Sequence, residues 1–465
     1  MITLRFAAVL IAGALVLGVA NPSHAAPAAE PVADRFVTLV AEHGEARAIA
    51  TQWLETHWEP AFVPMAVDAA YLRLRRGSSA DLVALLERQT GQSFGFDFSR
   101  WREWVWSQGV REHSEYASFK ARAYRIIDPA FEQFFRSADQ RTPRALIDLS
   151  EVVWGGVGRD AIPALRTPRM VRASEATYLR HHNIVFGIKI NGDVRAYPKR
   201  ILAWHEMFTD VVGGKHVAGV YCTLCGAVIL YETKTSDAEG ATPHQLGTSG
   251  LLYRSNKLMY DRATLSLWST MRGEPVVGPL VGRNIKLPRL SVVTTTWGEW
   301  LRRHPESLVL SEETGYHRNY AEGIAYGSYF ATDELMFPVS KRDGRLPNKQ
   351  EVFAVLAFGG RPLAISTKFL MRHPVWHGHV GQTQIVVLTD ASGANRAYDV
   401  GEVRITEWDR RARAIDSNNM SWSVLEDALV AADGRRLHRF PAHRAFWFGW
   451  YAAYPNTRLV MRTPQ

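Results

Sequence analysis

The sequence predicts an α+β protein, in which a helical N-terminal scaffold is followed by two copies of a β-rich unit packed as one larger domain. Between residues 35 and 150, apolar residues recur at three- and four-residue spacing, which is typical of helices. From Ile184 onward, short apolar runs alternate with turn residues, which is typical of strands. Several motifs then recur in the same order later in the chain, which indicates a duplicated unit.

The composition limits the classes of protein to which the chain can belong. Its 465 residues exceed the length of one ordinary domain, and 46% hydrophobic with 22% charged residues is the balance of a globular chain. The formal net charge of +9 is spread along the chain without a long Lys/Arg block, so we expect no nucleic-acid partner. Two cysteines are too few for a disulfide-rich scaffold.

Residues 1–25 have the features of a signal peptide. Arg5 precedes an apolar run over residues 6–20, and Ser23-His24-Ala25 offers the small residues of a cleavage site. The run is too short to span a bilayer comfortably, and an uncleaved membrane anchor is the alternative. We therefore expect a periplasmic or secreted protein with no stable membrane insertion after cleavage, in which residues 26–34 form a Pro/Ala linker.

The helical domain is predicted over residues 35–150. Its periodic segments are residues 36–50, 81–88, 100–108 and 114–135. Trp101, Trp104 and Trp106 are interpreted as side chains that pack between helices, with an aromatic ligand box as the alternative.

Strands and turns dominate from residue 184. A strand over residues 184–190, the hairpin turn Asn191-Gly192 and a returning strand over residues 193–197 form the first hairpin. We then expect a short helix over residues 199–208, a turn over residues 211–215, and strands over residues 216–221 and 227–233.

The internal repeat joins distant motifs at nearly constant offsets. An offset of 168 residues relates Gly192 to Gly360 and the segment 216–221 to 384–389, and an offset of 150 residues relates Trp297-Gly298-Glu299-Trp300 to Trp447-Phe448-Gly449-Trp450. A weaker match joins residues 266–269 to 419–423. We therefore predict β-rich repeat 1 over residues 178–312, a connector over residues 313–345, and β-rich repeat 2 over residues 346–462.

Both cysteines lie in one turn of repeat 1, Cys222-Thr223-Leu224-Cys225-Gly226. Repeat 2 has Thr389-Asp390-Ala391-Ser392-Gly393 at this place, so the duplicated fold does not require the cysteines and a chemical role is favoured. A structural disulfide would stabilise little, because its loop is short. A redox pair is a further interpretation, although the segment that follows has strand character and supplies no helix N-terminus. The leading interpretation is a soft-metal thiolate site for copper, with zinc second.

A metal site needs further ligands, because the chain has no second cysteine pair. His205 is the first choice, since its short helix precedes the strand that leads to Cys222. An open coordination position would permit a metal-dependent oxidoreductase with Cys222, Cys225 and Tyr260 as catalytic residues and Ser249, Asp261 and Trp268 as its substrate pocket. Its partner would be a small-molecule substrate or a metal donor. Metal sequestration without catalysis and thiol–disulfide exchange are the alternatives.

Residues 184–320 resemble the bacterial "domain of unknown function 3179" family. The resemblance rests on a set of motifs that includes Arg195-Ala196-Tyr197-Pro198, Trp204-His205-Glu206, Val211-Val212-Gly213-Gly214, Tyr221-Cys222-Thr223-Leu224-Cys225-Gly226, Gly247-Thr248-Ser249-Gly250-Leu251-Leu252, Met259-Tyr260-Asp261-Arg262, Leu267-Trp268-Ser269 and Gly278-Pro279-Leu280. The family usually has proline after the first cysteine, where this chain has Thr223. The resemblance implies an exported domain and carries no activity that transfers to this chain.

Overall fold

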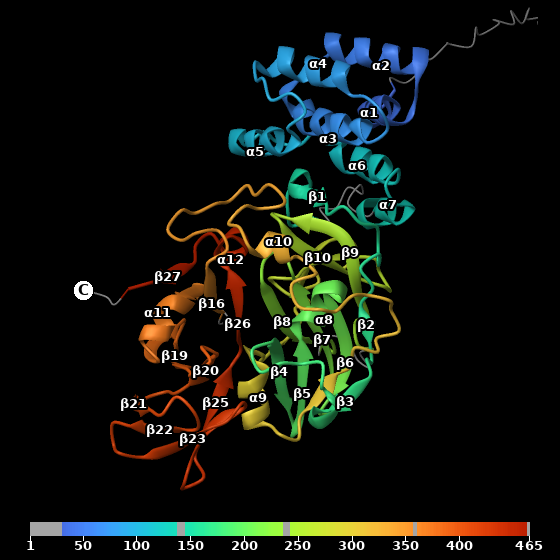
Figure 1. Cartoon of the computed structure of the whole chain (residues 1–465). Helices are drawn as coiled ribbons and strands as arrows, with labels where there is room; N and C mark the ends of the chain where they lie inside the picture. The colour runs from blue at the N-terminus through green and yellow to red at the C-terminus, as the bar shows by residue number, and fades with distance from the viewer. Residues whose placement is uncertain (1–29, 137–144, 236–241, 357–359, 463–465) are drawn as a thin grey trace, which may run out of the picture.

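The computed structural model describes residues 30–136, 145–235, 242–356 and 360–462. The predicted signal peptide and residues 26–29 of the predicted linker lie outside this part. The α+β prediction is confirmed: in the described residues seven α-helices precede a large β-rich region, and Figure 1 shows them stacked on one end of it. No helix in the described ranges is both long and apolar enough to cross a bilayer.

The helical region follows the predicted periodicity but is cut into shorter helices. Predicted helix 36–50 is divided at Gly44, and predicted helix 114–135 is divided before Pro129, which has no N–H for a continuing helix. Helix α1 begins at Val32, inside the predicted linker. The helices are α1 (Val32–Ala41), α2 (Gly44–Thr56), α3 (Val63–Leu74), α4 (Ala80–Thr90), α5 (Phe98–Gln108), α6 (Tyr116–Tyr124) and α7 (Pro129–Arg136).

The first β-rich unit contains three five-stranded sheets. Their strand orders are β1-β9-β10-β11-β12, β13-β8-β7-β6-β2 and β14-β4-β5-β15-β3. The elements are β1 (Val152–Trp154), β2 (Leu165–Arg166), β3 (Met170–Arg172), β4 (Ile184–Ile190), β5 (Asp193–Pro198), α8 (Lys199–His205), β6 (Met207–Val212), β7 (Lys215–Cys222), β8 (Ala227–Glu232), β9 (Leu246–Tyr253), β10 (Asn256–Asp261), β11 (Leu267–Ser269), β12 (Glu274–Val277), β13 (Arg289–Leu290), β14 (Val293–Thr296), α9 (Trp297–Arg303) and β15 (Leu308–Leu310). Strand β6 replaces the end of the predicted 199–208 helix, because the helix stops at His205.

The second β-rich unit follows the connector, residues 313–345, in whose described chain α10 (Gly327–Phe330) is the one regular element. The unit has a four-stranded sheet, β26-β16-β17-β27, and an eight-stranded sheet, β18-β19-β20-β25-β24-β23-β22-β21. Its elements are β16 (Glu351–Val355), β17 (Leu363–Ser366), α11 (Thr367–Arg372), β18 (Val375–Val380), β19 (Thr383–Thr389), β20 (Asn395–Asp399), β21 (Ile405–Trp408), β22 (Arg413–Asp416), β23 (Ser421–Val424), β24 (Ala428–Ala431), β25 (Arg436–Phe440), β26 (Ala442–Phe446), α12 (Trp447–Ala453) and β27 (Arg458–Val460).

The two units use the same strand order and the same tryptophan anchors. The order β14-β4-β5-β15 of the first unit recurs as β26-β16-β17-β27. The last two strands of each set, β5 with β15 and β17 with β27, run parallel. Trp300 Nε1 donates to Ser307 Oγ over 2.9 Å, and Trp450 Nε1 donates to Thr457 Oγ1 over 2.9 Å. Each bond joins the helix to the turn before the last strand, so the same polar contact closes both units.

Candidate functional site

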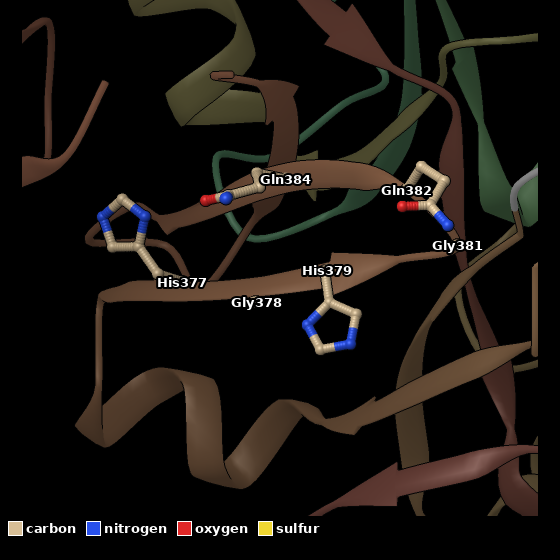
Figure 2. A pocket seen from close by; sticks show the side chains of 6 residues that line it. All are labelled: His377, Gly378, His379, Gly381, Gln382 and Gln384. Carbon is tan, nitrogen blue, oxygen red and sulfur yellow. The ribbon is translucent and has the colours of Figure 1, made fainter. Parts of the chain in front are cut away.

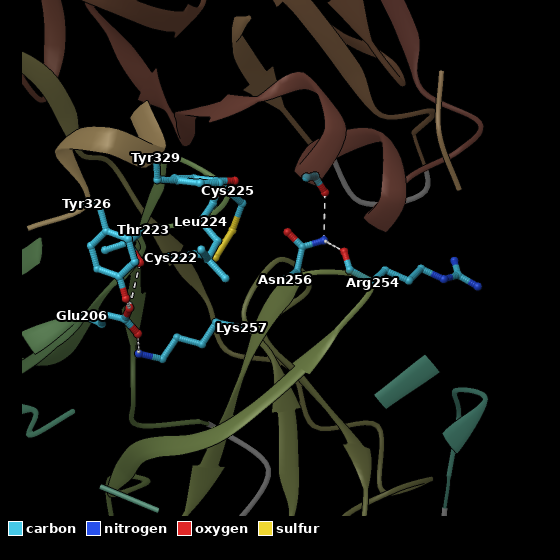
Figure 3. The surroundings of a disulfide bond; sticks show 11 residues. Glu206, Cys222, Thr223, Leu224, Cys225, Arg254, Asn256, Lys257, Tyr326 and Tyr329 are labelled. Carbon is cyan, nitrogen blue, oxygen red and sulfur yellow. Dashed lines mark hydrogen bonds and ion pairs between the residues drawn. A yellow bond between two sulfur atoms is a disulfide. The ribbon is translucent and has the colours of Figure 1, made fainter. Parts of the chain in front are cut away.

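The two cysteines form a disulfide at the turn between β7 and β8. Strand β7 ends at Cys222, which pairs with Ala227 at the start of β8. Gly226 completes the turn with a φ of +57°, a left-handed conformation that glycine adopts without strain. Figure 3 shows the disulfide bond beside Leu224, which with Thr223 separates the two cysteines in the chain.

The disulfide is sealed from solvent by the second unit and by the connector. Cys222 is 1% exposed and Cys225 0%. A Cβ atom added to Gly449 of α12 would lie 2.6 Å from Cys225 Cβ, so glycine is needed for this close approach. Phe446 N donates to Cys225 O over 2.8 Å, and Tyr329 Oη donates to Leu224 O over 2.8 Å. Reagents therefore cannot reach the sulfurs until these covering contacts separate.

A buried polar cluster lies on the other side of the turn (Figure 3). Its centre is Glu206, whose left-handed backbone conformation ends α8 and points the chain toward the cysteine turn. Glu206 Oε1 accepts from Thr223 Oγ1 over 2.7 Å and from Tyr326 Oη over 3.1 Å. Glu206 Oε2 accepts from Lys257 Nζ over 2.7 Å. The cluster therefore ties the cysteine turn to strand β10 and to the connector.

The pleat of β10 decides which of its side chains reach this cluster. Successive residues of a strand point to opposite faces, so Lys257 and Met259 share one face and Tyr260 lies on the other. Met259 belongs to the apolar core that also contains both cysteines, whereas Tyr260 packs with the core of the helical region. Burial lowers the pKa of Lys257 from its ordinary value, while the Glu206 carboxylate opposes this shift.

A pocket opens next to this cluster and beside the disulfide turn. Its polar lining includes Glu206, Lys257, Tyr326 and Thr248, and its apolar lining includes Leu224 of the cysteine turn. Its cavity volume is about 50 Å³. The pocket therefore combines an apolar wall with one buried ion pair.

The predicted third ligand, His205, is not brought to the cysteines. His205 Nδ1 donates to Pro163 O over 2.8 Å, and Nε2 accepts from Tyr320 Oη over 2.6 Å, so both ring nitrogens are engaged. Burial lowers the pKa of His205, which favours this neutral form. The reason is local: α8 ends at His205, and the next residue, Glu206, is the one that reaches the turn.

The described residues contain no group of three or more His, Cys, Asp or Glu side chains arranged to hold a metal ion. With the sulfurs joined to each other and His205 engaged elsewhere, the arrangement does not fit the expected copper or zinc centre. A second hollow lies on β18 and β19, lined by His377, His379 and Gln384 among others. Figure 2 shows the two imidazoles pointing apart, and His377 Nε2 donates to Ile405 O over 2.9 Å.

Tyr260 and Ser249 make contacts away from the disulfide. Tyr260 Oη donates to Asp160 Oδ2 over 2.5 Å, and its ring packs on Phe134 of α7 at 5.2 Å between centroids. Ser249 Oγ donates to Leu258 O over 2.6 Å, which joins β9 to β10. The structure therefore places Tyr260 between the β-rich and helical regions, and Ser249 within a sheet.

Asp261 and Trp268 form a pair that recurs in the second unit. Trp268 Nε1 donates to Asp261 Oδ2 over 3.1 Å, and Trp422 Nε1 donates to Asp416 Oδ2 over 3.0 Å. Both tryptophans are 0% exposed. Because the second unit keeps the pair without the cysteines, the pair helps to hold the hairpin in both units, and its role in a substrate pocket stays a prediction.

Sequence reasoning missed the residues that surround the turn. Glu206 stands next to His205 in the sequence. The histidine was preferred as the third ligand because the site was predicted to bind a soft metal. Lys257 carries only a weak signal, because its strand also contains Asn256 and Asp261. Tyr326 lies in the connector, where no periodic pattern points to the site.

The comparisons with known proteins identify a family and no characterised relative. A family model described as "Protein of unknown function (DUF3179)" matches residues 159–457. No curated protein matches the chain, and no solved structure matches it. The matched segment covers most of both β-rich units, so it confirms the resemblance noted over residues 184–320 and extends it to the second unit.

Proposed function

The chain belongs to the DUF3179 family, which is described as being of unknown function, and we propose that it is an exported thiol–disulfide redox protein. Its redox group is the Cys222–Cys225 pair. Export rests on the predicted signal peptide, and the redox role rests on the disulfide and its surroundings.

The observation that carries the proposal is the contrast between the cysteine turn and its counterpart in the second unit. There, Asp390 Oδ1 accepts from Ser392 N over 2.9 Å, from Ala394 N over 2.9 Å and from Ser392 Oγ over 2.6 Å. The fold thus holds this turn by a carboxylate, without sulfur. The cysteines are separated by three positions, and closing so short a loop stabilises a protein by only about 2 kcal/mol.

The redox step is thiol–disulfide exchange. A thiolate of a partner dithiol attacks one sulfur, the Cys222–Cys225 bond breaks, and the second sulfur leaves as a thiolate that takes up a proton. The second partner thiol then displaces the mixed disulfide, so the partner is oxidised by two electrons and Cys222 and Cys225 become thiols. Because both sulfurs are buried, the rate of this exchange depends on the separation of the covering segments.

The test is a redox titration of mature protein purified from a periplasm. The protein is equilibrated in dithiothreitol buffers of graded potential, and free thiols are trapped with a maleimide of high mass. We expect a reversible two-thiol transition in the native protein and no mass change in a Cys222→Ser/Cys225→Ser variant. A disulfide that is reduced only after the protein unfolds would refute the redox role and indicate a structural one.

Elemental analysis of the same samples distinguishes the redox proposal from the metal hypothesis. Copper or zinc binding by Cys222 and Cys225, with or without oxidoreductase activity, requires both cysteines to be reduced. Near-stoichiometric copper or zinc in the protein as purified, lost in the double variant, would replace the redox proposal with the metal-thiolate one.

A further inference from the structure

We infer that access to the Cys222–Cys225 disulfide is controlled by a lid in the connector, residues 324–337. The lid lifts from the cysteine turn and admits a partner thiol, while β26 and α12 of the second unit stay in place. This role of the lid rests on the proposed redox function, because it concerns the access of a thiol to the same disulfide.

The cover that the second unit provides is close-packed. Trp447 and Trp450 of α12 are both 0% exposed, and they belong to the same apolar core as Cys222 and Cys225. Gly449, between the two tryptophans, lies so close to Cys225 that it has no room for a side chain. Separation of this cover would expose the shared core to water, which makes it the costlier opening.

The lid is attached more weakly. Tyr329 is the one buried residue among residues 324–337, all of which the structure describes, and the other aromatic side chains of the lid are half-buried. Two hydroxyl groups tie the lid to the first unit. Tyr326 Oη donates to Glu206 Oε1, and Tyr329 Oη donates to Leu224 O. A segment held by few buried contacts opens locally at a smaller cost in free energy than the core, so the lid should open first.

The packing on the lid side of the turn is also looser. The cavity of about 50 Å³ lies there, lined by Leu224 and by three residues of the lid, Tyr326, Met336 and Phe337, among others. Met336 is 53% exposed, so the cavity lies close to solvent. Figure 3 shows Tyr329 next to Leu224, the residue that joins the cavity to the cysteine turn. Lifting the lid therefore widens a gap that is already present.

The experiment measures how the rate of disulfide reduction depends on urea. Oxidised, full-length mature protein is reduced by dithiothreitol at urea concentrations below its unfolding transition, and free thiols are trapped with the maleimide. Each rate is divided by that of oxidised glutathione in the same solution. Urea acts in proportion to the surface that an opening exposes, so lifting the lid should raise the rate by less than about threefold per molar urea. A steeper rise is expected if the whole second unit separates.

Two variants change the lid in opposite directions. Gly327→Ala adds a Cβ in α10 where the structure leaves open space, and alanine has fewer conformations than glycine in the open lid, so reduction should be about two- to fivefold slower. Asp333→Ala removes the carboxylate that accepts from Asn348 N and Lys349 N over 3.0 and 2.8 Å. Because these bonds fasten the lid to the second unit, reduction should be about three- to tenfold faster.

The matched control is Gly344→Ala, because Gly344 also has open space around it and lies outside the lid. We expect its rate to change by less than about 1.5-fold. Reduction that occurs only within the unfolding transition would refute both the lid and the redox function. Reduction of the native protein with a steep urea dependence, or at an unchanged rate in either lid variant, would overturn the lid and leave the redox function in place.

Discussion

Replacing Lys257 by methionine removes the positive half of the buried pair at the cysteine turn and keeps most of the side-chain volume. Loss of one partner of a buried ion pair typically lowers the free energy of unfolding by about 3–5 kcal/mol, because the other charge stays buried. Here Glu206 keeps hydrogen bonds from Thr223 and Tyr326. We therefore expect a decrease of about 3 kcal/mol, at the lower end of that range.

The double variant Glu206→Gln/Lys257→Met distinguishes the cost of leaving the Glu206 charge unpaired from the cost of losing packing contacts. It leaves no charge in the cluster, so we expect it to be less than about 1.5 kcal/mol below the wild type and more stable than Lys257→Met. The matched control is Lys215→Met, because Lys215 Nζ lies 2.6 Å from Glu232 Oε2 in a pair that is 37% and 22% exposed. Solvent screens that pair, and we expect a decrease below about 1 kcal/mol.

The assay is equilibrium urea unfolding of the mature protein, with the free energy taken from the transition in which strand circular dichroism is lost. We expect the free energy of unfolding to be lowest for Lys257→Met and higher for the double variant, with Lys215→Met close to the wild type. If Lys257→Met and Lys215→Met lose the same free energy, the cluster is solvated rather than buried, and its role at the cysteine turn is refuted.

Three further predictions address the fold and the covering of the disulfide. Trp268→Phe and Trp422→Phe each remove one tryptophan–aspartate hydrogen bond, so thermal unfolding should show losses within about 1 kcal/mol of each other; a loss confined to Trp268→Phe would point to a role beyond the shared hairpin. Burial lowers the pKa of His443 well below its ordinary value. Below about pH 6.5 the imidazole is therefore protonated in the unfolded chain but not in the folded one. The free energy of unfolding then falls by about 1.4 kcal/mol for each pH unit as the pH decreases. In urea unfolding at pH 7 and pH 5, His443→Leu should lose about 2 kcal/mol less than the wild type; equal losses would contradict a buried neutral imidazole. Tyr329→Phe removes the hydrogen bond to Leu224 O that helps to cover the turn, so stopped-flow reduction by dithiothreitol should be about three- to tenfold faster; an unchanged rate would show that this contact does not limit access.

The local elements were predictable because their signals are local. Strand β4 begins and ends at the predicted residues, and Asn191-Gly192 forms the predicted hairpin turn between β4 and β5. The predicted helix bounds are wrong where one periodic segment forms two helices, as at Gly44 and Pro129. The apolar spacing continues across the turn there, because both helices face the same core. Strand β6 was missed because its residues follow a helix without a glycine or proline between them.

The site was predictable only in part. Cys222 and Cys225 could be singled out because one unit has them and the other does not. His205 and Tyr260 were chosen for their chemistry, and their contacts depend on features that no motif records: the left-handed residue at Glu206 and the pleat of β10. Tyr326, more than a hundred residues along the chain from Glu206, reaches the cluster through the path of the connector.

The sequence by itself determined the order of helices and strands, the duplication and the place of the cysteine turn, because each depends on residues close together in the chain or on similarity at a fixed offset. Only the tertiary structure decided that Glu206, Lys257 and Tyr326 surround the turn and that Gly449 of the second unit closes over Cys225. Those contacts join segments up to more than two hundred residues apart, and they depend on how the sheets stack and which face of each strand is turned inward.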